Sequence, residues 1–118
     1  MKIFDCFMYF DEDIVLDVRL NTLHENVDYF VIVESKFTHK GEKRNLKFNY
    51  NNFPKFKDKI IYLVYDNEPS KIESVKENDT DYEKSTKYIF NAIYRENGQR
   101  NFIAEGLGKA TDDDLVLI

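Results

Sequence analysis

The sequence has 118 residues, of which 42% are hydrophobic and 15% are aromatic. This length and composition predict one globular domain over residues 1–118 and exclude a disordered chain. The net charge of −5, with lysines spread along the chain, argues against nucleic acid as a partner. The single cysteine, Cys6, cannot form an internal disulfide, and no segment reaches the roughly 20 apolar residues of a membrane span. We therefore expect a cytoplasmic protein without a membrane segment, in which Cys6 is a small buried side chain.

The first half of the chain predicts two strands on either side of a helix. Residues 3–10 are rich in aromatic and β-favouring side chains, which indicates a strand. Three carboxylates at 11–13 suit the start of a helix over residues 12–26. Apolar residues recur there at helical spacing, namely Leu16, Leu20, Leu23 and Val27. Residues 29–34 are nearly all apolar, as expected of a parallel strand that is covered on both faces.

The second half predicts two more strands and a longer helix. Residues 37–58 form a basic, aromatic and asparagine-rich connection with a turn at 51–54. Strands are expected over 59–65 and 115–118, with a polar loop over 66–81 and a helix over 82–107 between them. Gly98 lies inside this helix and costs about 1 kcal/mol relative to alanine, but we expect the helix to continue through it. Gly106 and Gly108 suit its C-terminal cap.

This order of elements is that of an α/β fold. With right-handed crossovers it predicts a Rossmann-like domain with a mostly parallel sheet of about four strands. Ligands of such sheets bind beyond the carboxyl ends of the strands. The most informative segment is therefore residues 29–44, where an apolar strand ends at Glu34 and runs into a polar loop.

The loop after Glu34 offers hydroxyl, imidazole and cationic groups, and each has an ordinary alternative. Glu34 could accept hydrogen bonds from a ribose, or it could instead cap backbone amides. His39 could be a base or a ligand, although an isolated loop histidine is usually solvated. Gly41 suits a turn that needs a positive φ. Lys40, Lys43 and Arg44 could hold a diphosphate, or they could equally form a solvated, lysine-rich edge.

Two other polar motifs carry less information. The run 112–114 contains an Asp-x-Asp pattern, but it precedes a strand and is interpreted as a solvated charge run. Gly106-Leu107-Gly108 follows a helix and lacks a third glycine, so it is not a dinucleotide fingerprint. No pair of nucleophile and base can be identified from the spacing. From residues alone, the sequence therefore predicts an α/β domain with a ligand edge of unspecified chemistry.

Several segments together resemble a known family. The segments are residues 2–7 (Lys-Ile-Phe-Asp-Cys-Phe), Glu12 before Arg19-Leu20-Asn21, residues 27–35 (Val-Asp-Tyr-Phe-Val-Ile-Val-Glu-Ser) followed by Thr38-His39-Lys40-Gly41, Lys59-Ile60-Ile61, Glu96 with Gln99-Arg100-Asn101, and residues 113–118. Their order and spacing resemble the N-terminal half of glycosyltransferase family 17, the family of β-1,4-mannosyl-glycoprotein 4-β-N-acetylglucosaminyltransferase. The resemblance runs along nearly the whole chain and is most specific in the Val-Glu-x-x-x-Thr-His-x-Gly portion.

The resemblance implies the N-terminal half of a glycosyltransferase A-type domain. The donor would be UDP-N-acetylglucosamine and the acceptor a mannosyl glycan, with Mn²⁺ or another divalent cation bridging the diphosphate as a Lewis acid. Seven residues would form the donor site: Asp5, Phe7, Glu34, Thr38, His39, Gly41 and Arg100. Asp5 and Phe7 would lie at the first strand's end, with Phe7 bordering the uracil, Glu34 accepting from uracil or ribose, and Arg100 meeting a phosphate. Packing is the alternative role for each of them.

The resemblance also bears on the metal. Family members continue past such a final strand into Ser-Asp-x-Asp-Glu, the metal-binding motif, whereas this sequence stops at Ile118. We therefore expect a truncated transferase domain that lacks the metal ligands and is inactive alone. Two alternatives are kept: a non-catalytic α/β module that binds a nucleotide or a protein, and a remnant without function.

Overall fold

The computed structural model describes residues 1–118 as a Rossmann-like α/β domain. The strands and α-helices are, in chain order, β1 (Ile3–Tyr9), α1 (Asp13–Leu23), β2 (Tyr29–Ser35), β3 (Ile60–Tyr65), α2 (Asp81–Asn101) and β4 (Leu115–Leu117). Short 3₁₀ helices precede β3 and follow α2, namely η1 (Tyr50–Asn52), η2 (Pro54–Lys59) and η3 (Phe102–Gly106). The predicted elements are therefore confirmed, with two differences. α1 ends three residues earlier than expected, and the helix expected over 82–107 is α-helical only to Asn101 and continues as the 3₁₀ helix η3.

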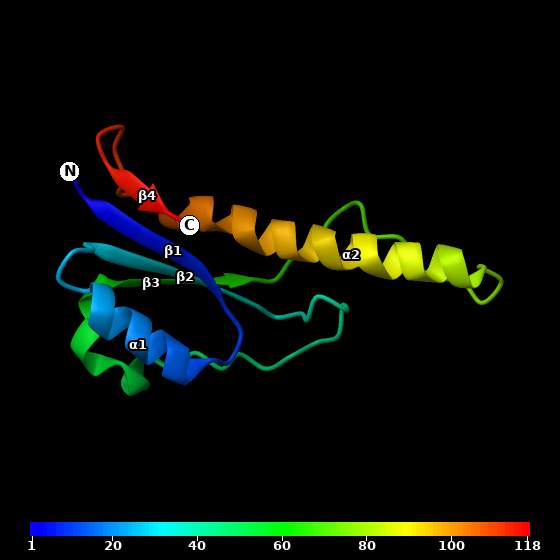
Figure 1. The fold of residues 1–118 in the computed structure, drawn as a ribbon, viewed down its shortest axis with the longest axis horizontal. Helices are drawn as coiled ribbons and strands as arrows, with labels where there is room; N and C mark the ends of the chain where they lie inside the picture. Colours follow the sequence, from blue (N-terminus) through cyan, green and yellow to red (C-terminus); the bar gives the residue numbers. More distant parts are fainter.

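The sheet has four parallel strands in the order β3-β2-β1-β4. β1 pairs with β2 from Phe4 to Tyr9, but it pairs with β4 only from Ile3 to Asp5. All strands run in one direction, so their carboxyl ends share one edge of the sheet (Figure 1). The mostly parallel sheet expected from the sequence is confirmed.

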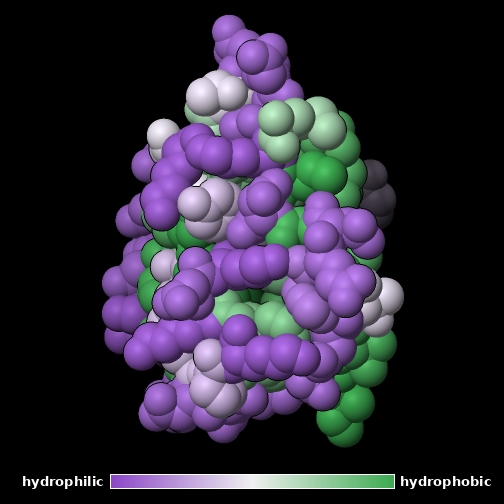
Figure 2. Space-filling model, turned by 90° about the vertical axis from the view of Figure 1, so that its left-hand side faces the viewer, coloured by the Kyte–Doolittle hydropathy of each residue, from purple (hydrophilic) through white to green (hydrophobic).

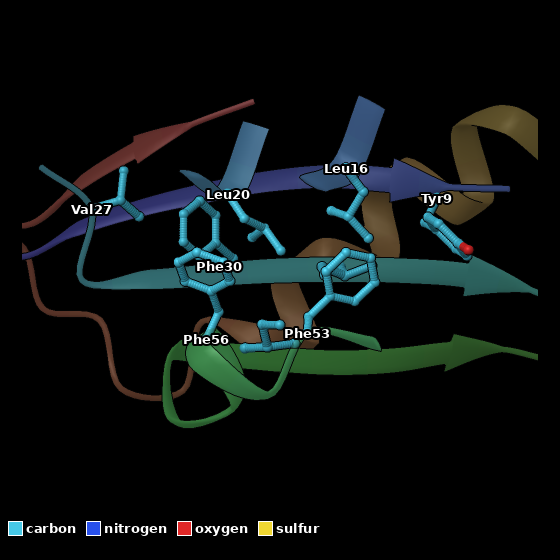
Figure 3. Close-up of a cluster of buried hydrophobic side chains, with 9 residues drawn as sticks. Tyr9, Leu16, Leu20, Val27, Phe30, Phe53 and Phe56 are labelled. Atoms are coloured by element: carbon cyan, nitrogen blue, oxygen red, sulfur yellow. The ribbon is translucent and has the colours of Figure 1, made fainter. Parts of the chain in front are cut away.

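The two faces of the sheet are covered by different elements. α1 with η2 packs on one face, where alternate residues of β2, Phe30 and Ile32, are fully buried (Figure 3). α2 with η3 packs on the other face, where Val31 and Val33 are fully buried beside Ile103. This explains the continuous apolar run of β2, because side chains on both of its faces belong to a core.

α2 continues through Gly98, as predicted, and it begins with a capping box. The Thr80 hydroxyl accepts from the Glu83 amide, while the Glu83 carboxylate accepts from the Thr80 amide. A Cβ on Gly98 would overlap the Tyr65 hydroxyl on β3. The close approach of β3 therefore requires a glycine at position 98, although glycine has a low helix propensity.

The predicted glycine cap of α2 is wrong. Gly41 is the only residue with a positive φ, so neither Gly106 nor Gly108 adopts the left-handed conformation of such a cap. A Cβ on Gly106 would lie 2.6 Å from a Val31 methyl carbon and 3.1 Å from one of Leu63. Gly106 thus lets η3 lie directly on the sheet.

Only the C-terminal part of α2 packs on the sheet, and the rest projects beyond the carboxyl ends of the strands (Figure 1). The molecule is consequently elongated, with dimensions of 55 × 32 × 20 Å. The opposite end, at the strands' amino ends, is mainly hydrophilic, with hydrophobic side chains gathered toward one flank (Figure 2). No helix has both the length and the apolar character that crossing a membrane requires.

Candidate functional site

A cavity of about 640 Å³ lies at the carboxyl ends of β1 and β2. Its walls come from the end of β1 and the following loop (Met8, Tyr9, Phe10, Glu12), from the segment after β2 (Ser35, Phe37, Thr38, His39, Lys40, Glu42, Arg44) and from α2 (Gln99). This is the edge at which parallel α/β sheets bind ligands. Its volume is also within the range of about 300–1,000 Å³ that is typical of small-molecule sites.

The end of β1 supplies an aromatic and acidic wall. The Phe10 ring is 51% exposed, and the Arg44 guanidinium lies over it at 4.4 Å from the ring centre. The Glu12 carboxylate accepts from the Phe10 and Asp11 amides, which fixes the turn between β1 and α1. The Tyr9 hydroxyl donates to Asp13, and burial together with this carboxylate raises the pKa of Tyr9. Tyr9 therefore stays protonated at neutral pH.

Residues 35–44 form a hairpin that makes the second wall. An antiparallel bridge joins Phe37 to Lys43, and the Thr38 hydroxyl accepts from the Glu42 amide at 3.1 Å. Gly41 lies at the tip with φ of +91°, which confirms the turn predicted there. The sequence-predicted residues Thr38, His39 and Gly41 are thus brought together, and two of them, Thr38 and His39, line the cavity.

Arg95 of α2 holds the tip of this hairpin. Its guanidinium donates to the His39 carbonyl at 3.1 Å and pairs with both oxygens of Glu68 at 3.0 and 3.1 Å. A Cβ on Gly41 would lie 2.5 Å from an Arg95 nitrogen, so the guanidinium packs directly on the glycine backbone. The hairpin is therefore fastened to the projecting part of α2.

Glu34 is fully buried beneath the cavity and has four partners. Its carboxylate accepts from the Lys47 amide at 2.7 Å, the Phe48 amide at 3.1 Å and the Tyr62 hydroxyl at 2.6 Å. It also pairs with Arg44 at 2.9 Å. Burial and this carboxylate raise the pKa of Tyr62. The structure thus favours the alternative role of Glu34 as a cap of backbone amides, and it leaves no exposed carboxylate oxygen for a uracil or ribose.

Arg44 connects the two walls of the cavity. Its guanidinium donates to the Ser35 carbonyl at 2.6 Å and to the Phe10 carbonyl, in addition to pairing with Glu34. A single cation therefore joins the end of β1, the end of β2 and the buried carboxylate. Its side chain is only 8% exposed, so it shapes the cavity more than it offers free charge.

Asp5 and Phe7 do not lie at the end of β1, which corrects the position expected for them. The strand continues to Tyr9, and Asp5 is buried in its first half. Both Asp5 oxygens accept from Arg19 of α1 at 2.7 Å, and the same guanidinium covers the Phe7 ring at 4.1 Å. The Asp5 hydrogen bond raises the pKa of Arg19. These residues join α1 to β1, while Tyr9 and Phe10 occupy the strand end.

Arg100 is also separate from Thr38 and His39. It lies on the surface of α2, pairs with Glu96 at 2.9 Å and lines a smaller pocket of about 170 Å³. Phe7, Arg19 and Ile118 line the same pocket, and Met8 lines both this pocket and the large cavity. Of the predicted donor residues, Thr38 and His39 therefore line the large cavity and Phe7 and Arg100 line the smaller pocket. The other three line neither: Asp5, Glu34 and Gly41.

Comparison with known proteins identifies the family. The sequence profile of glycosyltransferase family 17 matches residues 1–105. The chain belongs to this family.

Curated relatives agree with this assignment. Over 59 residues the chain is 41% identical to β-1,4-mannosyl-glycoprotein 4-β-N-acetylglucosaminyltransferase of Homo sapiens and of Rattus norvegicus, and 39% identical to that of Mus musculus. Each alignment covers 47% of this chain and 11% of the relative, so the chain matches about a tenth of each relative's length. No solved structure matches the chain.

The family resemblance implies a divalent cation, and the residues present do not form a site for one. No three histidine, cysteine, aspartate or glutamate side chains converge anywhere in the structure. In the acidic run before β4, Asp114 accepts from the Lys2 amide at 2.7 Å and the Thr111 amide at 2.8 Å. These amides lower the pKa of Asp114, which therefore serves the turn before β4.

Several cavity residues of this glycosyltransferase-family chain were not predicted from its sequence. Phe10 and Glu12 follow the true end of β1, which lies later than the positions assigned to Asp5 and Phe7, whereas Arg44 was among the cations expected to hold a diphosphate. Gln99 comes from a helix 55 residues beyond Arg44, and its buried amide donates to the Val33 carbonyl at 3.0 Å. The sequence allowed two interpretations of residues 99–101, as part of the ligand crevice or as an ordinary polar helix surface, and the tertiary fold places Gln99 at the cavity.

Proposed function

We propose that this chain forms the donor-binding part of a glycosyltransferase that transfers N-acetylglucosamine from UDP-N-acetylglucosamine to a mannosyl glycan acceptor. The observation that carries the proposal is the cavity at the carboxyl ends of β1 and β2, in a chain of glycosyltransferase family 17. The names of the relatives support N-acetylglucosamine as the transferred sugar and a mannosyl glycoprotein as the acceptor.

In this proposal the nucleoside occupies the cavity. The exposed Phe10 ring, with the Arg44 guanidinium over one face, offers a flat surface on which a base can stack. The Thr38 hydroxyl accepts from a backbone amide and still has a proton to donate to a ligand oxygen. His39, at the fastened tip of the hairpin, would meet the ribose or the first phosphate.

In this proposal the diphosphate, which is attached to the nucleoside, would lie beside the cationic groups of the site. Lys40 lines the cavity and makes no ion pair, unlike Arg44, whose charge is matched by Glu34. The role of Arg100 at a phosphate remains a prediction from the family resemblance. It would require the ligand to extend past Met8 into the smaller pocket.

Calorimetric titration of the 118-residue chain with UDP-N-acetylglucosamine tests the proposal, with and without Mn²⁺. We expect His39→Ala to weaken binding about tenfold or more, which corresponds to about 1.4 kcal/mol. His24→Ala is the matched control, because His24 lies at the C-terminal end of α1 and its ring packs on Phe56, outside the cavity. Equal effects of the two histidine substitutions, or no binding by the parent chain, would remove the cavity from the proposal.

A non-catalytic nucleotide-binding module is the second candidate function. Two observations favour it: the chain has a cavity of suitable size, and no three potential metal-ligating side chains lie together in the structure. This candidate predicts binding of UDP that is equally tight with and without Mn²⁺ and indifferent to the sugar. The transferase proposal predicts that the N-acetylglucosamine group adds affinity beyond that of UDP.

A further inference from the structure

The projecting part of α2 has one covered side and one open side. On the covered side, the buried Asn91 side chain binds both backbone groups of Glu73 at 2.8 and 3.0 Å, and Lys87 pairs with Asp79 at 2.8 Å. On the open side, Ile89 and Ile93 are 59% and 41% exposed. A solvated helix face does not require two isoleucines in adjacent turns, so this side has the character of a contact surface.

The open side follows a regular spacing. Alternating steps of four and three residues connect Tyr82, Thr86, Ile89, Ile93, Glu96 and Arg100. This is the spacing of the seam of a two-stranded coiled coil, with aliphatic side chains at its two central positions, Ile89 and Ile93, and it extends for about 27 Å along the helix. Phe90, which is 49% exposed, flanks the apolar centre of the seam.

We propose that α2 pairs with α2 of a second copy of this chain in an antiparallel arrangement centred near Asn91. This arrangement places Ile89 of one copy against Ile93 of the other. It also places Thr86 against Glu96, and Tyr82 against Arg100, so that no like charges face one another. A parallel pair would instead place Glu96 against Glu96 and Arg100 against Arg100, which is unfavourable.

The shape of the molecule permits this pairing. α2 projects beyond the sheet on the side away from the amino ends of the strands, so the bodies of two antiparallel copies lie at opposite ends of the helix pair (Figure 1). The loop binds the side of the helix that carries Asn91 and Lys87. Of the seam residues only Thr86 shares a pocket with this loop, and Ile89 and Ile93 stay exposed. The inference does not depend on the proposed function, because Ile89 and Ile93 lie outside the nucleotide cavity.

Light scattering after size-exclusion chromatography tests the proposal on the whole 118-residue chain. We expect twice the chain mass of 14.1 kDa, and a shift to the monomer mass for Ile89→Glu and Ile93→Glu. Both residues are exposed, so circular dichroism should show unchanged folding. Val18→Glu is the matched control, because Val18 is a 61% exposed apolar residue on α1, and it should leave the dimer intact. Arg100 is left unchanged because it is also predicted to meet a phosphate.

Disulfide cross-linking tests the orientation. A mixture of Ile89→Cys and Ile93→Cys chains should form the mixed disulfide at least several-fold faster than either variant alone, while the native Cys6 is buried and does not compete. A monomer at all concentrations, a dimer that survives both glutamate substitutions, or a dimer dissociated equally by Val18→Glu would overturn the proposal. Preferential coupling of position 89 to position 89 would overturn the antiparallel arrangement.

Discussion

Glu34 shows how a residue at a predicted binding position can serve the structure instead. Its carboxylate is fully buried and satisfies two amides, one hydroxyl and one guanidinium. We predict that Glu34→Ala destabilises the fold by about 3–5 kcal/mol, because it leaves Arg44 buried without its counter-charge. Urea unfolding measures this change, and Glu77→Ala, at an exposed carboxylate, should stay within about 0.5 kcal/mol of the parent chain. A small effect at Glu34 would show that the network relaxes around the substitution.

The buried thiol of Cys6 should make the free energy of unfolding depend on pH in the alkaline range. Burial, with a contribution from the Asp5 carboxylate, raises the pKa of the Cys6 thiol from 9.0 to about 11. The folded thiol therefore holds its proton more tightly than the unfolded one, so its contribution is complete below pH 9.0 and is lost as the pH rises toward 11. Urea unfolding across this window should show a shallower loss of stability in Cys6→Ala than in the parent chain. Identical slopes would contradict the raised pKa.

The packing of α2 against β3 depends on Gly98, which leaves space for the Tyr65 side chain. An alanine in a helix normally gains about 1 kcal/mol over glycine, but here its Cβ would overlap the Tyr65 hydroxyl. We predict that Gly98→Ala destabilises the fold by about 1–3 kcal/mol, as overpacked substitutions do. Thermal unfolding of Gly98→Ala with Tyr65→Phe should recover part of the loss. Gly108→Ala is the control, since a Cβ there meets no atom within 4 Å.

The hairpin over residues 35–44 depends on a contact between two elements. We predict that Gly41→Ala loosens it, because alanine is strained at φ of +91° and its Cβ would displace the Arg95 guanidinium. Arg95→Ala should have a similar effect through loss of the His39 and Glu68 contacts. Amide hydrogen exchange should then rise at Thr38, Gly41 and Glu42 while β2 stays protected. Unchanged exchange in both variants would show that the hairpin is held by its own bonds.

At the scale of the molecule, the fold followed from the sequence more closely than the site did. Burial determines the pattern of apolar residues within each element, and this pattern can be recognised in a single sequence. Examples are the continuous apolar run of β2 and the helical spacing of Leu16 and Leu20. The sequence predicted a strand over residues 3–10, close to the observed Ile3–Tyr9, but the family resemblance assigned Asp5 and Phe7 to the strand end that Tyr9 and Phe10 occupy. The site also required a tertiary contact, since Gln99 reaches the cavity only because α2 crosses the sheet.

The predicted site residues do not all lie together, because they come from elements whose relative positions depend on the tertiary fold. Thr38, His39 and Gly41 are neighbours in sequence and stayed together, whereas Arg100 was placed by resemblance and lies in the adjacent pocket. Asp5 and Glu34 are buried carboxylates within strands, and each pairs with an arginine, the half-buried Arg19 and the buried Arg44. A carboxylate in an apolar run therefore indicated an internal ion pair more directly than it indicated a ligand contact.

Amide chemical shifts of the labelled chain, recorded as UDP-N-acetylglucosamine is added, show directly where the nucleotide sugar binds. The claim that the cavity at the ends of β1 and β2 holds the nucleotide predicts shifts at Tyr9 to Glu12, in the hairpin from Ser35 to Arg44, and at Gln99. Shifts confined to the pocket beside Arg100 and Ile118, or no shifts at saturating nucleotide, would contradict it.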